Sequence, residues 1–589
     1  MGQWKTTIFL NHVHGTEKSE PINIKRGIFQ GDSLSPLLFC ISLFPLSQLL
    51  NKQKCGYDCQ NKRFNHLFYM DDLKLFAKND KELQELLGIV KEYSSSIKMM
   101  FNTDKCAKLT MKRGQHSKSS NITLDPETTI RELDNHEEYK YLGISEGAGI
   151  SHKKMKERLK KEYIRRIRLV LKSQLNSKNK INAINSLAIP VLLYSFPIIN
   201  WTMGEIKAID IKTRKLLTCN RAHHPKADVD RLYLKRSEGG RGLLQVEMNF
   251  KTTFIGQQKY LENTKDWMMT CVRTHDSQKK LYSIKKKSDD YRKDLGVDIV
   301  GESAVSTGNV ISDAKAAKLI AKKAALNKLD NNWRNKALHG KFPERASKAD
   351  VDKERTFLWL KSSNLKAETE GFIIAAQDQS LKTNNYLKNI MKVGGDGKCR
   401  YCKEQLEAID HLVSGCSTLA KSEYIIRHNK VAQYIHWKVC QHYDMEVNSK
   451  WYEHQTEPVT ENSKATILWD FAIQTDRTIK ANRPDLVIRD KKTRTCLLLD
   501  VSIPTDRNTS LKTFEKLSKY KDLDIELSKS WKVKTKTVPI IIGALGVINR
   551  STPKYVKEVP GKISISELQK ITLLGTSRIL RKALSLNAL

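Results

Sequence analysis

Three groups of side chains have the types and spacing to do chemistry, and the first is a pair of adjacent aspartates. Asp71 and Asp72 follow Met70 between two short strand-like runs, residues 66–69 and 73–76. These runs predict a β-hairpin with both carboxylates at its tip. Adjacent carboxylates repel, and a divalent cation such as Mg²⁺ or Mn²⁺ would remove that cost and suit two-metal phosphoryl transfer. The competing interpretation is an acidic hairpin turn without function.

The second group is a cluster of three cysteines and one histidine. Cys399, Cys402, His411 and Cys416 have the ligand types and loop lengths of a closed tetrahedral zinc site. Thiolates and imidazole select Zn²⁺ over Mg²⁺. We expect a structural ion that orients a basic loop toward nucleic acid. Cys440 lies nearby but outside the pattern, and we interpret it as a core thiol.

The third group is a pair of aspartates associated with two predicted strands, residues 483–488 and 496–501. Asp500 lies inside an apolar run, where a carboxylate is costly unless it is paired or holds a metal. Asp485 and Asp500 could share one Mg²⁺ ion, and the helix that follows carries Lys516 and Lys519 toward a scissile phosphate. The sequence leaves the choice between these lysines open. The alternative is an ordinary salt bridge between Asp500 and a lysine.

The elements around these groups indicate an α+β chain of several domains. Residues 34–50 are apolar but interrupted by two prolines, which favours a buried helix over a membrane span. Residues 151–175 predict a basic amphipathic helix and residues 311–333 a second helix. Residues 275–310 are polar and lysine-rich, which indicates a linker. Two apolar strands, 496–501 and 538–545, bracket a helix near the end of the chain.

Composition points to a nucleic-acid partner. The 589 residues contain 103 Lys and Arg against 65 Asp and Glu, a formal charge of +38. A phosphate backbone is the usual partner of such an excess, and the basic residues do not cluster beside an apolar segment, which disfavours a membrane. The start of the chain has no signal-peptide pattern, and the 11 cysteines are irregularly spaced. We therefore expect an intracellular, reducing environment.

Four ordered segments resemble the later palm motifs of reverse transcriptases from non-LTR retrotransposons. They are residues 26–39, 68–72, 101–106 and 139–143. The resemblance implies that Asp71 and Asp72 belong to the catalytic metal site, with Asp71 the direct ligand. It also implies contacts to nucleotide, template or primer from a further set of residues: Arg26, Gln30, Gly31, Lys105, Tyr141, Leu142 and Gly143.

The C-terminal half resembles the non-LTR elements that carry a zinc knuckle and a restriction-like endonuclease. Segments such as 223–226, 239–243, 368–371 and 375–379 recur in those elements. The resemblance implies that Arg427 and His428 lie at the nuclease site or its DNA contact. It also implies the following domains: partial palm 1–145, helical thumb 146–275, basic helical linker 276–393, zinc knuckle 394–420, α/β restriction-like endonuclease 421–550 and a helical tail 551–589.

The mechanism implied by this family is target-primed reverse transcription. The nuclease would nick chromosomal DNA, and the freed 3′-hydroxyl would prime copying of an RNA template from dNTPs. The protein would act in the nucleus, after a cytoplasmic stage as a ribonucleoprotein. Residues 1–25 contain no aspartate, whereas the family has a further catalytic aspartate at that point, so we expect an N-terminally truncated polymerase. A decayed nucleic-acid-binding remnant and a nuclease-only fragment are the alternatives.

Overall fold

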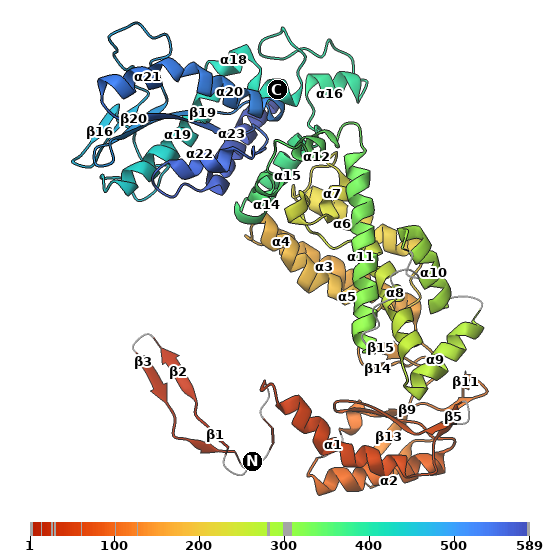
Figure 1. The fold of residues 1–589 in the computed structure, drawn as a ribbon. Helices are drawn as coiled ribbons and strands as arrows, with labels where there is room; N and C mark the ends of the chain where they lie inside the picture. Colours follow the sequence, from red (N-terminus) through yellow and green to blue (C-terminus); the bar gives the residue numbers. More distant parts are fainter. Residues whose placement is uncertain are drawn as a thin grey trace. The chain divides into compact units, whose positions relative to one another are not determined.

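The computed structural model describes residues 4–12, 15–24, 27–28, 31–59, 62–99, 102–126, 128–279, 283–297 and 309–585, with only the backbone of residues 11 and 12. Contacts divide the chain into two compact units. Unit 1 comprises Met1–Glu157 and Lys265–Gln278, and unit 2 comprises Arg158–Thr264 and Lys279–Leu589. Strands and helices occur together in unit 1 and in the C-terminal part of unit 2, with a helical stretch between them in the sequence, which is consistent with the α+β prediction (Figure 1).

Unit 1 consists of short strands together with helices α1, α2 and α9 among its described residues. Its elements are β1 (Lys5–Thr6), β2 (Phe9–His12), β3 (Gly15–Lys18), β4 (Ile22–Asn23), α1 (Ser35–Asn51), β5 (Tyr57–Cys59), β6 (Lys62–Phe64), β7 (His66–Tyr69), β8 (Asp72–Leu75), α2 (Asp80–Ser96), η1 (Thr103–Lys105), β9 (Ala107–Lys108), β10 (Met111–Lys112), β11 (Gln115–His116), β12 (Ile122–Asp125), β13 (Thr128–Glu132), β14 (Tyr139–Tyr141), β15 (Ile144–Glu146) and α9 (Trp267–Gln278). Its core lies where Leu46 and Leu50 of α1 pack against Leu86 and Val90 of α2.

Helix α1 confirms the predicted helix but only half of its predicted burial. Leu43, Leu46 and Leu50 are buried. Leu37, Ile41 and Phe44 are 56%, 58% and 60% exposed. The apolar side chains of α1 project from all of its faces, but within the described residues α2 and the β7–β8 hairpin cover only one side of the helix.

Unit 2 begins with a helical body and ends with a sheet. The helical elements are α3 (His152–Lys172, which starts in unit 1), α4 (Ser177–Ala183), η2 (Ile184–Ala188), α5 (Ile189–Leu193), α6 (Met203–Cys219), α7 (Val229–Tyr233), η3 (Arg236–Glu238), α8 (Val246–Asn263), α10 (Ile284–Leu295), α11 (Val310–Arg334), α12 (Lys341–Ala346), α13 (Lys353–Thr356), α14 (Leu358–Ser362), α15 (Ala367–Gln377), α16 (Asn384–Asn389), α17 (Ile409–Ser414) and α18 (Ser417–Ala420). Helices α3 and α11 confirm the two predicted helices.

Residues 284–295, whose polar composition indicated a linker, form helix α10. One aromatic ring anchors it, because Tyr291 packs 6.0 Å from both Phe250 and Phe254 of α8, measured between ring centroids. Lys251 of α8 also pairs with Asp294 at 2.6 Å. A narrow apolar stripe is enough to hold a short, otherwise polar helix against a larger one.

Two buried ion networks connect segments that lie far apart in the sequence. Glu370 of α15 accepts hydrogen bonds from Arg241 Nε at 3.0 Å and from Arg236 Nη1 at 2.8 Å. Arg231 of α7 pairs with Asp378 at 2.7 Å, and both side chains are fully buried. Segments 239–243, 368–371 and 375–379, which the sequence analysis singled out, therefore each contribute a side chain to these buried networks.

The C-terminal part of unit 2 is a five-stranded sheet between two layers of helices. Its elements are α19 (Glu423–His442), β16 (Val459–Glu461), β17 (Ala465–Trp469), β18 (Leu486–Asp490), β19 (Thr495–Ser502), η4 (Asp506–Asn508), α20 (Thr509–Lys519), α21 (Lys521–Ser530), β20 (Lys534–Ile541), α22 (Thr552–Glu558) and α23 (Ile565–Ser585). The strand order is β16-β17-β18-β19-β20, and only the β19–β20 pair is parallel.

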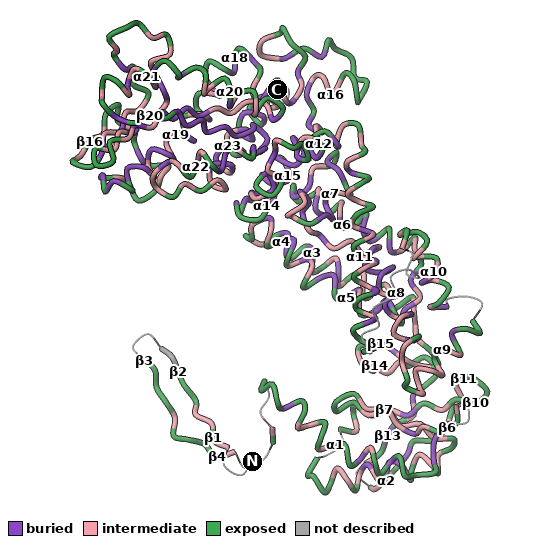
Figure 2. Tube along the Cα trace, viewed as in Figure 1, coloured by how far each residue is buried: buried purple, intermediate pink, exposed green. Residues whose placement is uncertain are grey.

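Alternation along β19 decides which layer each side chain meets. Leu499 and Val501 pack with α19, α22 and α23, whereas Leu498 packs with Leu523 and Leu527 of α21. Figure 2 shows that buried residues concentrate along this sheet and along α19 and α23. Asp500 lies between Leu499 and Val501, so its side chain belongs to the face covered by α20 and α21.

Candidate active and metal sites

The four predicted zinc ligands converge in the structure. Cys399 and Cys402 lie on a turn, where Lys403 N donates to Cys399 O at 3.0 Å. His411 lies on α17, and Cys416 immediately precedes α18. One possible ligand atom of each residue lies within 4.8 Å of those of the other three.

The distances in this cluster fit a tetrahedral ion. Two thiolates bound at ~2.3 Å would lie about 3.8 Å apart, and a thiolate and an imidazole about 3.6 Å. The Cys399 and Cys416 sulfurs are 3.9 Å apart, and Cys402 Sγ lies 3.4 Å from His411 Nε2. His411 Nδ1 lies 3.0 Å from Gln405 Oε1, an outer contact that fixes the ring and leaves Nε2 toward the sulfurs. The residues therefore fit zinc.

The third group of residues meets at the end of β19 next to α20. Asp500 is 2% exposed, and its Oδ2 lies 2.5 Å from Lys516 Nζ, whose side chain is 17% exposed. Lys519 Nζ lies farther away, 3.9 Å from Asp500 Oδ1, and its side chain is 45% exposed. The salt bridge that the sequence offered as an alternative is thus present with Lys516.

Asp485 lies beside Asp500 because it directly precedes β18, whose Leu486 pairs with Leu499. Its Oδ2 accepts hydrogen bonds from Val501 N at 2.6 Å and from His428 Nε2 at 3.0 Å. Burial opposes a charge on His428, but the hydrogen bond and the negative charge of Asp485 outweigh it and raise the pKa of His428 to about 9. The structure therefore brings His428 to the carboxylate pair.

Arg427 does not fit the DNA contact that the resemblance implied. Its side chain is buried, Nη1 donates to Thr576 Oγ1 of α23 at 2.9 Å, and its guanidinium lies over the Tyr424 ring. Burial lowers the pKa of Arg427 to about 10. Consecutive residues on a helix point about 100° apart, so His428 faces the sheet edge while Arg427 faces α23. Its role in this structure is to join α19 to α23.

Tyr520 is a site residue that the sequence prediction missed. It is 1% exposed, and its hydroxyl donates to Asp500 Oδ1 at 2.7 Å and accepts from Lys519 Nζ at 2.8 Å. The available signal was its position one helical turn after Lys516, which directs both side chains to the same face. Tyr520 thus connects the second lysine to the buried carboxylate.

The paired aspartates of unit 1 lie at the tip of the predicted hairpin. Strands β7 and β8 pair Tyr69 with Asp72, and Met70 takes a left-handed conformation, with a φ of 56°, to close the turn. Asp71 and Asp72 are both exposed. In the described part of unit 1, neither carboxylate makes a hydrogen bond or an ion pair, so both are available to an ion.

The other residues that the resemblance to the palm motifs implied differ in what the structure says of their surroundings. Lys74 of β8 lies over the Tyr141 ring at 5.0 Å and pairs with Glu146 at 2.5 Å, which brings the β14–β15 hairpin beside β8. Leu142 and Gly143 form its turn with φ values of 46° and 81°. The carbonyl of Lys105 accepts from Tyr139 Oη at 2.7 Å. Gly31 is described with a φ of 97°, whereas Arg26 and Gln30 lie outside the described residues.

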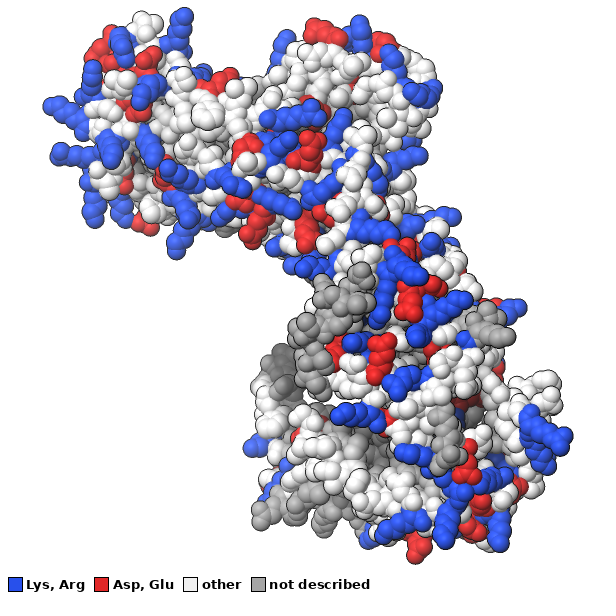
Figure 3. Space-filling model, turned by 45° about the vertical axis from the view of Figure 1, so that its right-hand side comes forward, with Lys and Arg blue, Asp and Glu red and all other residues white. Residues whose placement is uncertain are grey.

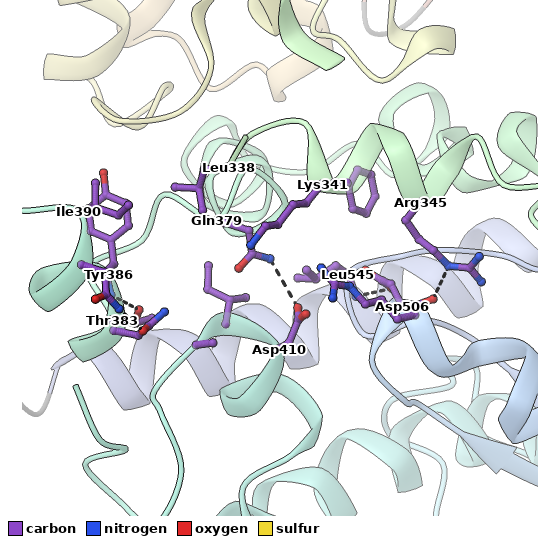
Figure 4. A pocket seen from close by; sticks show the side chains of 16 residues that line it. Leu338, Lys341, Arg345, Gln379, Thr383, Tyr386, Ile390, Asp410, Asp506 and Leu545 are labelled. Carbon is purple, nitrogen blue, oxygen red and sulfur yellow. Dashed lines mark hydrogen bonds between the residues drawn. The ribbon is translucent and has the colours of Figure 1, made fainter. Parts of the chain in front are cut away.

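A cavity of about 350 Å³ lies between α12, α16, α17 and η4 of unit 2 (Figure 4). Lys341, Gln379, Asp410 and Asp506 are among its lining residues. Asp506 is buried, and its Oδ1 accepts from Leu545 N at 3.2 Å. Burial, reinforced by the charge of Asp410, raises the pKa of Asp506 to about 7.

On the face shown in Figure 3, Lys and Arg side chains are scattered among other residues rather than gathered in one patch, with fewer Asp and Glu between them. Within the described residues no helix is both long and apolar enough to cross a bilayer.

Comparison with known proteins identifies the family of the N-terminal part. Residues 2–145 match the family model described as reverse transcriptase (RNA-dependent DNA polymerase). A Pol polyprotein from the type-1 retrotransposable element R2 of Popillia japonica is 25% identical over 273 residues, which cover 44% of this chain and 44% of the relative. A Pol polyprotein from the type-2 element R2DM of Drosophila melanogaster is 26% identical over 196 residues, which cover 33% of this chain and 18% of the relative.

The chain spans less than half the length of each of these two relatives. The matched domain nevertheless contains the aspartate hairpin, and both relatives come from the same class of mobile element. The chain therefore carries a reverse transcriptase domain and is related to the reverse transcriptases of non-LTR retrotransposons.

Proposed function

We propose that the chain acts in retrotransposition as an RNA-directed DNA polymerase joined to a DNA endonuclease, through target-primed reverse transcription. Its partners would be an RNA template, a DNA target that becomes the primer, and dNTPs. Because the target is chromosomal, the protein would act in the nucleus after cytoplasmic assembly with RNA. The observation that carries the proposal is the presence of two separate carboxylate pairs, one in each unit, on a strongly basic chain.

The endonuclease proposal rests on the surroundings of Asp500. A carboxylate that is 2% exposed in a strand is costly, and here it faces Lys516, with Asp485 immediately before the adjacent strand. Asp485 and Asp500 would hold a divalent ion, which when bound stabilises charge on the scissile phosphate. Lys516 would contact the phosphate, because it is the lysine nearer to Asp500. His428 would keep Asp485 oriented.

The polymerase proposal rests on the exposed tip of the β7–β8 hairpin. Asp71 and Asp72 would hold divalent ions there, and the β14–β15 turn would support the primer end. The zinc knuckle would have a structural role, since three sulfurs and one imidazole close a four-ligand site and leave no position for a reactive water. Basic side chains of α3 and α11 would contact phosphates and position the nucleic acid without reading its sequence.

Nicking of supercoiled DNA with Mg²⁺ tests the endonuclease. Lys516→Ala is compared with Lys512→Ala, a matched control on the same helix whose ammonium pairs with Glu515 at 2.8 Å instead. We expect Lys516→Ala to slow nicking roughly 10²-fold, the loss typical of one preorganised charge-stabilising group, and Lys512→Ala to leave it unchanged. Equal rates for the two variants, or no nicking by the parent, would refute the assignment.

Primer extension tests the polymerase separately. The full chain receives an annealed RNA template and DNA primer with dNTPs and Mg²⁺, and Asp71→Asn is compared with Asp134→Asn, an exposed aspartate away from the hairpin tip. We expect extension by the parent and the control variant only. A nuclease-only chain is the second candidate, favoured by the buried Asp500–Lys516 pair beside Asp485. Nicking without extension would select that candidate, and loss of both would select a nucleic-acid-binding remnant.

A further inference from the structure

A second cluster of metal-type ligands lies inside the sheet domain, apart from the zinc knuckle residues. His436 and Cys440 are one turn apart on α19, so they project from the same face of the helix. His454 comes from the segment between α19 and β16. His436 and Cys440 have no exposed surface and His454 is 6% exposed. This is the only other cluster of His, Cys and acidic ligands within ligating distance among the described residues.

The donor atoms of this cluster converge on a small volume. His436 Nδ1 lies 2.8 Å from His454 Nε2 and 3.5 Å from Cys440 Sγ. In a tetrahedral zinc site, two imidazole nitrogens would be about 3.3 Å apart and a nitrogen and a sulfur about 3.6 Å. The nitrogen–sulfur distance already fits, and the two rings need to separate by only about half an ångström.

The surroundings hold these ligands in place. Gln433 Nε2 donates to the carbonyl oxygen of His454 at 2.5 Å, which fixes the backbone of the third ligand against α19. The Trp469 ring of β17 packs edge-on against His436, with 5.7 Å between ring centroids. Such outer contacts orient the residues that bind the ion in metal sites. A hydrogen-bonded histidine pair would account for two of the three residues, and the sulfur of Cys440, which the sequence indicated was a core thiol, lies at ligating distance from that pair.

We propose that His436, Cys440 and His454 bind one zinc-class transition-metal ion, in addition to the ion of the knuckle. One thiolate and two imidazoles select a borderline-soft ion over Mg²⁺ or Ca²⁺. The burial of all three residues makes the ion structural, because substrate cannot reach it. Its function is to fasten residues 443–458 to α19, beneath the sheet that carries Asp485 and Asp500.

Metal content and Co²⁺ spectra of the full chain test this proposal. The parent, refolded with Zn²⁺, is compared with Cys440→Ser and with Cys496→Ser, a matched control because Cys496 is an equally buried thiol on β19. Cys402→Ser removes a knuckle ligand. We expect about two ions in the parent and the control, and about one in Cys440→Ser and in Cys402→Ser. With Co²⁺, the ion left in Cys402→Ser should show weaker thiolate charge-transfer absorption than the knuckle ion, because the second site has one thiolate and the knuckle has three.

If Cys440→Ser fails to fold, the number of ions bound per chain still tests the proposal, because Cys402→Ser by itself leaves only the second ion. One ion in the parent and none in Cys402→Ser would overturn the proposal. So would two ions in Cys440→Ser and in His454→Gln, since the second ion would then be held elsewhere. Retention of one ion by folded Cys402→Ser, and its loss when His454→Gln is added, would establish the site.

Discussion

The buried carboxylate of Glu370 should be one of the most sensitive positions in the helical body of unit 2. Its Oε1 accepts from Ser177 Oγ at 2.6 Å, Arg236 Nη2 at 2.9 Å and Arg241 Nε at 3.0 Å, and its Oε2 accepts from Arg236 Nη1 at 2.8 Å. Arg241 is 1% exposed, so its charge has almost no access to water. Glu370 is thus the main neutralising partner of a buried guanidinium.

The expected cost follows from what Glu370→Ala leaves behind. Removing one partner of a buried ion pair typically costs ~3–5 kcal/mol, because the remaining charge stays desolvated. We expect a loss in that range for Glu370→Ala, a large part of the ~5–15 kcal/mol that stabilises a typical domain. Glu370→Gln keeps the volume but not the charge, so most of the loss should remain if charge pairing rather than packing is responsible.

Glu368 provides a matched control, two residues earlier on the same helix. Its side chain is 54% exposed and lies 3.8 Å from Arg581, and such surface pairs contribute about 0–1 kcal/mol. The assay is urea unfolding of the full chain followed by tryptophan fluorescence, since Trp333 and Trp359 are fully buried in unit 2. Similar unfolding free energies for Glu370→Ala and Glu368→Ala would refute the reasoning.

Three further predictions concern protonation, zinc and close packing. The pKa of Asp506 is about 7 in the folded chain, whereas that of an ordinary aspartate is 3.8. Its contribution to the free energy of unfolding should therefore fall as pH rises from about 4 to about 7, by up to ~4 kcal/mol. Asp506→Asn should remove this pH dependence from thermal unfolding curves, and an unchanged dependence would contradict the prediction. Cys399→Ser should lose the knuckle ion and the hydrogen-exchange protection of residues 399–416, and retention of zinc would count against the ligand set. A Cβ at Gly240 would lie 2.2 Å from Leu234 O, whereas one at Gly204 meets nothing within 4 Å, so Gly240→Ala should lower the melting temperature and Gly204→Ala should not.

Local patterns predicted the chemistry better than the packing. The β7–β8 hairpin and the zinc cluster are each encoded within a short segment, and the structure has both as the sequence indicated. Asp485 and Asp500 also follow from a pattern, since each lies at a recognisable strand and the two strands are neighbours. Their functional roles and the six-domain division stay predictions.

What the sequence could not supply depends on partners distant in the chain. The exposed side of α1 was missed because hydrophobicity does not say which neighbour covers a helix. Tyr520 was missed because its hydroxyl becomes relevant only when the end of α20 meets β19. His436 and His454 were missed because 17 residues separate them, the end of α19 followed by irregular chain, a spacing that resembles no familiar zinc motif.

The buried network around Glu370 also has a consequence in time. Ser177 and Glu370 are 193 residues apart in the chain. Arg236 and Arg241 emerge later, 134 and 129 residues before Glu370. At a synthesis rate of ~5–20 residues per second, they would wait about 6–27 s on the ribosome for the carboxylate that neutralises them. During that interval the guanidinium groups of Arg236 and Arg241, which have little exposure in the folded chain, have to remain solvated. The helical body therefore cannot close until α15 has emerged.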